Sequence, residues 1–116
     1  MLTPQKAKRA YEHAESALVG NELEDAEKEL NSALGMYPKS AVAWCLMGTL
    51  HEEKLQLDKA FTDYSQALLA DSQLQAAYLG LARIAFREKR WQEVVRFTDH
   101  VASVNPIAFP VAYLYP

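Results

Sequence analysis

Residues 41–74 read AVAWCLMGTLHEEKLQLDKAFTDYSQALLADSQL, and their pattern of large and small apolar residues recurs on both sides of this segment. A shift of 34 residues brings side chains of one kind into one column: large apolar, small or helix-ending. The columns are Leu23, Leu57 and Trp91; Ala26, Ala60 and Val94; Leu30, Tyr64 and Thr98; Ala33, Ala67 and Val101; and Pro38, Ser72 and Pro106. Three copies span about residues 7–40, 41–74 and 75–108, and such a period is typical of stacked structural units.

Each copy holds two stretches in which apolar residues recur at steps of three and four, the spacing of an α-helix. The first helix is predicted to begin at Thr3 and Pro4 and to close at Gly20–Asn21. A second helix starts at about Leu23, and Pro38 stops it. The other four helices are predicted at about Ala41–Lys54, Leu57–Ala70, Leu74–Glu88 and Trp91–Val104. Short turns make neighbouring helices antiparallel, and the absence of sustained alternation predicts no strands.

Small residues in the repeated columns predict how these helices pack. Ala14, Gly48 and Ala82 share a column on the first helix of each pair, opposite the column of Ala60 on the second. Small side chains that face each other let two helices approach closely and bury larger neighbours such as Phe61. Because one pair buries too little surface to be stable alone, stacking is expected to make the core continuous.

These residues resemble the tetratricopeptide repeat (TPR) family, whose pattern is Trp, Leu-Gly, Tyr, a later Ala and a closing Pro. The second copy is most similar, although His51 replaces the Tyr and Ser72 the Pro; it supplies Trp44, Met47, Gly48, Ala60, Tyr64 and Ala67. The third copy supplies Tyr78, Leu81, Ala82, Ala85, Val94 and Pro106. The resemblance implies an all-α fold, a right-handed superhelix of three helix-turn-helix repeats in one domain over residues 1–116. Residues 109–116 would start a truncated fourth repeat with a partial seventh helix.

The resemblance also implies a function: the first helices would line a concave groove that binds a peptide or a partner's helix, as a non-catalytic scaffold. The groove positions in this chain are Lys8, Tyr11, Glu15, Cys45, Thr49, Glu52, Glu53, Leu79, Arg83, Phe86 and Arg87, with Leu18, Val42 and Ala76 beside them. One TPR subclass grips a C-terminal carboxylate of chaperones. Its clamp residues are replaced here by Tyr11, Glu15, Leu46, Ala76 and Gly80, so that activity is not expected.

Charge is distributed unevenly along the predicted groove. The three copies carry formal charges of -3, -3 and +2. We therefore hypothesise a partner segment that is basic at one end and acidic at the other, held by apolar contacts with Tyr11, Leu79 and Phe86. Such complementarity would set orientation and association rate. The alternative is that these charges belong to solvated helix faces, where ion pairs contribute little.

Other function classes are disfavoured by composition and spacing. A basic cluster lies near Phe86 and Trp91, but acidic residues interrupt it and the net charge of -3 argues against nucleic acid; its members are Arg83, Arg87, Lys89, Arg90 and Arg96.

His13 and His51 occupy apolar columns and are expected in the core or an interface, and with His100 they lack metal-ligand spacing. Neither a metal, a cofactor nor a catalytic constellation is predicted, and Cys45 is interpreted as a small groove hydrophobe. No signal peptide or membrane-spanning run is present, which favours the cytoplasm without fixing the compartment.

Residues 107–116 begin a fourth copy and are too apolar for a solvated tail. We expect them to pack on the helix from Trp91 to Val104 or to exchange with a neighbouring chain. The predicted oligomer interface is Phe109, Val111, Tyr113, Leu114 and Tyr115. The alternative function is therefore a homo-oligomerisation module that uses this uncapped end.

Overall fold

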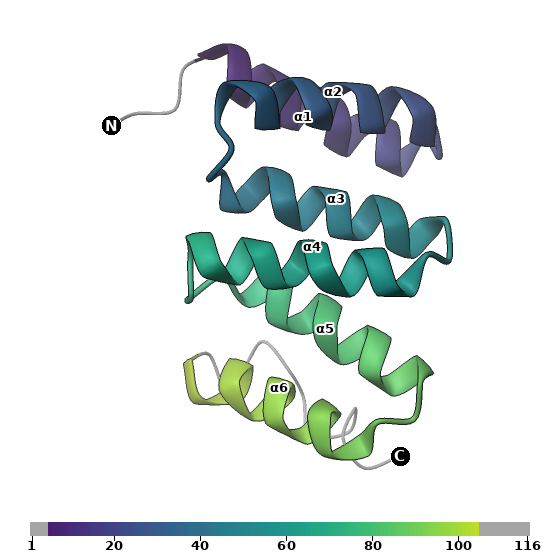
Figure 1. Ribbon diagram of the computed structural model, residues 1–116, viewed down its shortest axis with the longest axis vertical. Helices are drawn as coiled ribbons and strands as arrows, with labels where there is room; N and C mark the ends of the chain where they lie inside the picture. The colour runs from purple at the N-terminus through teal and green to yellow at the C-terminus, as the bar shows by residue number, and fades with distance from the viewer. Residues whose placement is uncertain (1–4, 105–116) are drawn as a thin grey trace.

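A computed structural model describes residues 5–104 of the chain, and its side chains from residue 8 to residue 103. Six helices follow one another: α1 (Gln5–Val19), α2 (Leu23–Met36), α3 (Ala41–Glu53), α4 (Leu57–Ala70), α5 (Gln75–Arg87) and α6 (Trp91–Val104). They pair as antiparallel hairpins stacked in chain order (Figure 1). The described residues contain no strand and no helix long and apolar enough to cross a membrane. The predicted all-α solenoid is confirmed.

The helix bounds follow the sequence pattern closely. The predicted bounds of α4 and α6 are correct, and α3 and α5 each end one residue earlier than predicted. Leu74 is the residue before α5 rather than its first residue, because its backbone is extended, with φ -74° and ψ 100°. The predicted start at Thr3 and Pro4 and the whole predicted interface at Phe109–Tyr115 lie outside the described residues.

The stack has two layers. The backbones of α1 and α3, and those of α3 and α5, lie close together, whereas no such close approach joins α2 to α4 or α4 to α6 within the described part of the chain. The first helices of the hairpins are therefore closer together than the second helices, so they form the inner layer of a curved stack. The small residues explain this approach: Ala14, Gly48 and Ala82 are all buried, as are Ala26 and Ala60 facing them.

α2 packs between α1 and α3, and α4 packs between α3 and α5, which divides the core into two clusters. Met47 of α3 packs with the first hairpin, in a cluster that also contains Leu30 and Ala14. Leu81 of α5 packs in the same way with Tyr64 of α4. Because each hairpin covers the next one, the core is continuous only when hairpins are stacked.

The turns between paired helices use one left-handed residue each, and these recur with the same period as the core. Asn21, Leu55 and Lys89 have φ values of 61°, 59° and 59°. The residue after each one donates its backbone N–H back into the preceding helix, for example from Glu22 to the carbonyl of Ala17 at 2.7 Å. The predicted close of the first helix at Gly20–Asn21 is confirmed, since α1 ends at Val19, and it is Asn21 rather than the glycine that adopts the positive φ.

Candidate peptide-binding groove

The inner layer presents a stripe of side chains that is apolar and partly open to solvent. On α3 this stripe contains Val42, Cys45 and Thr49, at the three- and four-residue spacing that keeps side chains on one helix face. On α5 it contains Leu79 and Phe86. Val42 is 42 % exposed and Phe86 is 53 % exposed, although both are large apolar residues that a core would bury.

The predicted groove residues all retain accessible surface. Those that are exposed are Lys8, Glu15, Glu53, Arg83, Phe86 and Arg87. Those that are half-buried are Tyr11, Cys45, Thr49, Glu52 and Leu79. Their placement on one layer agrees with a shared surface, and their role in binding stays a prediction.

Tyr64 connects the outer layer to this surface. Its ring comes from α4 and is fully buried where it passes the backbones of α3 and α5. A Cβ atom built on Gly48 would lie 2.7 Å from Tyr64 Cε1, and one built on Gly80 would lie 2.6 Å from the same atom. Real Cβ atoms essentially never come this close, so only glycine leaves room for the ring.

The hydroxyl group of Tyr64 joins a polar cluster on the groove side of α3. It donates to Glu52 Oε1 at 2.7 Å and lies 3.2 Å from Thr49 Oγ1. The Thr49 hydroxyl in turn donates to the carbonyl of Cys45 at 3.3 Å. Burial, more than the bond to Glu52, raises the pKa of Tyr64 far above its ordinary value, so the phenol stays protonated.

Arg83 binds the same carboxylate from α5. Its Nε donates to Glu52 Oε2 at 3.0 Å and its Nη2 to Oε1 at 3.1 Å, so the pair is bidentate. Nη2 also lies 3.3 Å from the Tyr64 hydroxyl. The hydrogen bond with Glu52 raises the pKa of Arg83 further above its already high value. The charges of Glu52 and Arg83 therefore neutralise each other. The hypothesised difference in charge between the two ends of the groove then depends on Glu15, Glu53 and Arg87.

Cys45 lies near this cluster and is poorly reactive. Burial raises the pKa of its thiol to about 11, with Arg83 acting in the opposite direction and Glu52 in the same direction. A thiol with such a pKa is almost wholly protonated at neutral pH, so it is a weak nucleophile. This agrees with its interpretation as a groove hydrophobe.

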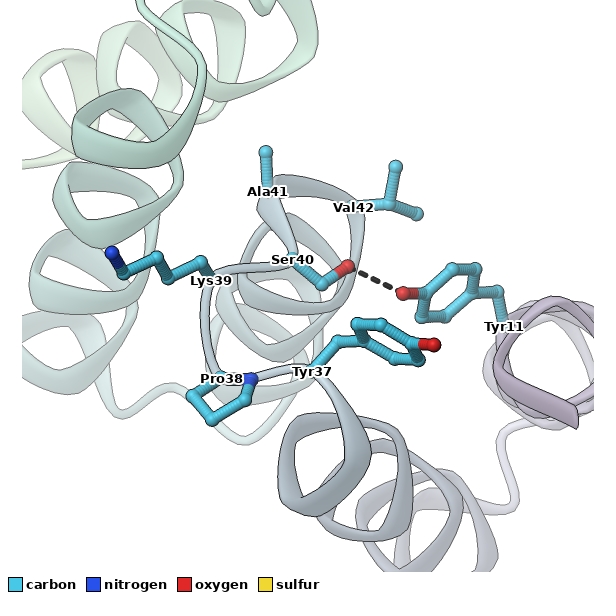
Figure 2. A pocket seen from close by; sticks show the side chains of 7 residues that line it. All are labelled: Tyr11, Tyr37, Pro38, Lys39, Ser40, Ala41 and Val42. Carbon is cyan, nitrogen blue, oxygen red and sulfur yellow. Dashed lines mark hydrogen bonds between the residues drawn. The ribbon is translucent and has the colours of Figure 1, made fainter. Parts of the chain in front are cut away.

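A shallow hollow of about 550 Å³ opens at one edge of the groove, where α1 meets the start of α3 (Figure 2). Its lining is Tyr11, Tyr37, Pro38, Lys39, Ser40, Ala41 and Val42. The Tyr11 hydroxyl is 2.5 Å from Ser40 Oγ, which also accepts the backbone N–H of Ala43 and caps α3. The sequence reasoning missed the hollow, although Ser40 before an apolar run is a recognisable N-cap. In Figure 2 the Lys39 side chain points away from the two rings.

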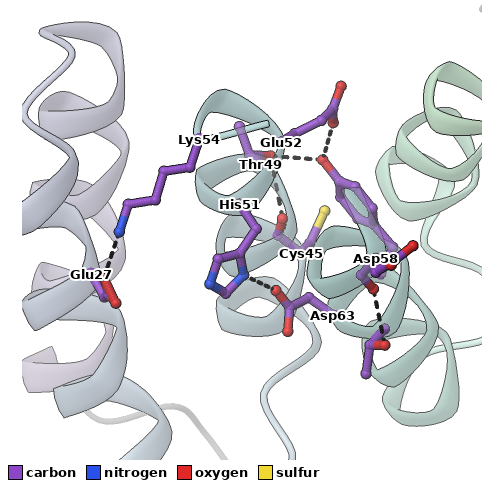
Figure 3. A network of polar contacts seen from close by, with 10 residues as sticks. Glu27, Cys45, Thr49, His51, Glu52, Lys54, Asp58 and Asp63 are labelled. Atoms are coloured by element: carbon purple, nitrogen blue, oxygen red, sulfur yellow. Dashed lines mark hydrogen bonds and ion pairs between the residues drawn. The ribbon is translucent and has the colours of Figure 1, made fainter. Parts of the chain in front are cut away.

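Figure 3 also shows two polar contacts between helices that lie outside the groove. Lys54, at the end of α3, donates to Glu27 of α2 at 2.8 Å and lowers the pKa of that carboxyl. His51 Nδ1 is hydrogen-bonded to Asp63 Oδ2 of α4. Burial raises the pKa of Asp63, and the contact with His51 opposes that shift.

The other histidines differ in environment. His13 was expected in the core or an interface, but it is exposed in this structure, so the core expectation is wrong. The equivalent positions Met47 and Leu81 are covered by the preceding hairpin, whereas the structure describes no helix before α1. His100 stacks on Tyr78 with ring centroids 3.9 Å apart. Over residues 5–104 no group of three or more His, Cys, Asp or Glu residues could hold a metal ion.

The basic cluster considered for nucleic acid is largely engaged within the chain. Arg90 pairs with Glu88 at 2.7 Å and with Glu93 at 3.2 Å, and its guanidinium lies 5.5 Å from the centre of the Phe61 ring. Arg96 lies similarly over the ring of Phe97. The two carboxylates that pair with Arg90 reduce the charge available for a phosphate backbone.

Comparison with known proteins gives a structural likeness only. Neither a family model nor a curated protein matches the sequence. Among solved structures 37 chains match. One is the Arabidopsis OM64 TPR domain, with a TM-score of 0.81 and 20 % sequence identity over 88 % of this chain and 84 % of that one. The chain therefore has the TPR fold, as the resemblance implied.

Proposed function

We propose that this chain is a non-catalytic protein-interaction scaffold whose inner layer, formed by α1, α3 and α5, binds a peptide or a helix of a partner. The observation that carries the proposal is the partly exposed apolar stripe along the inner helices. Phe86 and Val42 keep about half of their surface open on helices whose other faces are buried. The likeness to a solved TPR domain supports the same conclusion.

The groove is suited to binding because its backbone is fixed before a ligand arrives. The Tyr64 ring holds α3 and α5 at a set separation, and the bidentate Arg83–Glu52 pair joins the same two helices on their open side. A rigid surface loses little conformational freedom on binding, which favours affinity. Covering the 53 % of Phe86 that is still exposed would contribute about half of the roughly 1.5–3 kcal/mol that full burial of such a side chain provides.

The single cysteine provides a direct test. Cys45 lies half-buried in the stripe, so a bound peptide should cover it and slow its alkylation. Peptides selected from a displayed random library would be added, and the rate of thiol alkylation measured at alkaline pH. We expect protection with the native chain, and weaker peptide binding to Phe86→Asp.

Leu69→Asp is the matched control, because Leu69 is 82 % exposed on α4 in the outer layer. It places the same charge on the other face and should leave peptide binding unchanged. Peptides that bind without protecting Cys45 and that are weakened by Leu69→Asp rather than Phe86→Asp would refute the proposal.

The alternative of homo-oligomerisation stays a prediction, because its residues lie outside the described part of the chain. Its test is sedimentation velocity over a range of concentrations, comparing the native chain with a variant in which Tyr113 and Leu114 are both replaced by Glu. Concentration-dependent association that the variant loses would support it. A monomer at all concentrations would exclude it.

A further inference from the structure

One face of α5 combines apolar and cationic side chains. Leu79, Arg83, Phe86 and Arg87 are spaced by four, three and one residues, so they share a face of the helix. The two arginines are one turn apart and both are exposed. Apolar residues lie on either side of Arg83 along the helix axis, so a segment that crosses this face would meet an apolar contact, a cation and a second apolar contact.

Arg83 is held in place with part of its guanidinium unused. The side chain is 54 % exposed, whereas that of its partner Glu52 is only 12 % exposed. A guanidinium has five N–H donors, and the contacts with Glu52 and Tyr64 use those on Nε and Nη2. Nη1 has no hydrogen-bond partner among residues 8–103. Arg83 therefore presents a fixed, unfilled edge to the groove.

Arg87 supplies the uncompensated charge beside that edge. Glu52 neutralises one arginine, and no ion pair engages Arg87 in the described structure. The equivalent positions on the other inner helices carry no cation: they are Glu15 and Val19 on α1, and Thr49 and Glu53 on α3. An anionic group is therefore attracted to α5 and repelled by the acidic residues on the preceding helices.

We propose that Arg83 Nη1 and Arg87 bind the side-chain carboxylate of an Asp or Glu within the partner segment, flanked by apolar residues that pack on Leu79 and Phe86. This inference rests on the proposed groove function and specifies its partner chemistry. An internal acidic residue is favoured over a terminal carboxylate because the apolar contacts lie on both sides of Arg83. A preorganised Arg is a frequent source of binding energy, since little side-chain freedom remains to be lost.

The test uses the peptides selected on the native chain from a displayed random library whose members have no free C-terminal carboxylate. We expect an Asp or Glu flanked by apolar residues to recur among them. Replacing that residue by Asn or Gln should weaken binding about tenfold, equivalent to about 1.4 kcal/mol. Arg87→Gln should cause a similar loss, and adding the peptide substitution to it should cost little more, because both remove one interaction.

Two further variants make the test specific. Arg83→Lys keeps the charge but lacks the second nitrogen of the fork, so it should also weaken acidic peptides. Arg96→Gln removes the same charge from α6 in the outer layer and should leave affinity unchanged. Arg87→Gln leaves the Glu52 cluster intact, so it keeps the test valid if Arg83→Lys lowers the stability of the fold.

The outcomes separate this inference from the general function. Peptides that protect Cys45 but contain no acidic residue, or that bind Arg87→Gln as tightly as the native chain, would overturn the carboxylate site and leave the groove function standing. A library that yields no groove-binding peptide would overturn both. Binding of a single-stranded oligonucleotide that Arg87→Gln abolishes, with no acidic peptide recovered, would replace the carboxylate by phosphate and also refute the proposal.

Discussion

Replacing Gly80 by Ala should destabilise the protein, although Ala is the better helix former. The new Cβ would lie 2.6 Å from Tyr64 Cε1, about 1 Å inside ordinary van der Waals contact. The ring is fully buried and cannot move aside into solvent. Overpacking of this kind costs roughly 1–3 kcal/mol, and the short distance indicates the upper part of that range. Helix propensity returns about 1 kcal/mol, so the expected net loss is about 2 kcal/mol.

The same substitution at Gly35 is the matched control. Gly35 lies in α2 with no atom within 4 Å of its built Cβ, so Ala there meets open space. It should stabilise the chain by about 0.5–1 kcal/mol through the lower backbone entropy of Ala in the unfolded state. Identical chemistry at two helical glycines should therefore change stability in opposite directions.

Urea unfolding followed by circular dichroism measures both effects as shifts in the midpoint at constant slope. A double variant that adds Tyr64→Leu to Gly80→Ala isolates the contact, because the second substitution removes the ring. The Gly80→Ala penalty should then shrink by about 1 kcal/mol or more. If Gly80→Ala proves as stable as Gly35→Ala, the wedge of Tyr64 between the helices does not constrain the fold.

Three other predictions concern single sites. Leu55→Gly should stabilise the chain by about 0.5–1 kcal/mol in urea unfolding. The left-handed backbone costs Leu55 about 1–2 kcal/mol, and glycine removes this cost, although its larger entropy in the unfolded chain offsets part of the gain. The pKa of Cys45 is raised to about 11 in the folded chain, so its contribution to stability should fall as pH rises from about 9 to about 11, and Cys45→Ala should remove that component of the slope. Lys54 lowers the pKa of Glu27, so stability is lost as pH falls through the carboxylate range, and Lys54→Met should show a weaker acid dependence in thermal melts below about pH 5.

The fold was predictable from the sequence because its determinants are local and repeated. Helical periodicity places Ala60 and Ala82 on buried faces whatever the partner residue is, and both are buried as expected. The pattern is read from three copies at once, so a mismatch in one copy does not hide it. The substitution of His51 for an aromatic residue therefore did not obscure the pattern. Turn chemistry was less predictable, because Gly20 looks like the closing residue while Asn21 adopts the positive φ.

The contacts that organise the groove depend on the distance between hairpins, which the sequence pattern does not encode. The pattern assigns Tyr64 to a large apolar column, but the destination of its hydroxyl follows from the gap between Gly48 and Gly80. Glu52 and Arg83 were both placed in the groove, and their pairing was missed. A separation of 31 residues, one turn short of the repeat, was a usable signal for neighbours on successive inner helices.

The wedged ring has a consequence for how the stack can bend. Because the ring of Tyr64 lies close to Gly48 of α3 and Gly80 of α5, we expect the joint between the second and third hairpins to resist a change in tilt. The equivalent position at the first joint is Leu30, which packs in one cluster with Ala14 and Leu46, the residues at the positions of the two glycines, so no ring is inserted there. We therefore expect any difference in tilt between hairpins to occur at the first joint, near Tyr11. We therefore expect the groove to be most rigid at the end that carries Arg83, where both the Tyr64 ring and the ion pair with Glu52 join the inner helices.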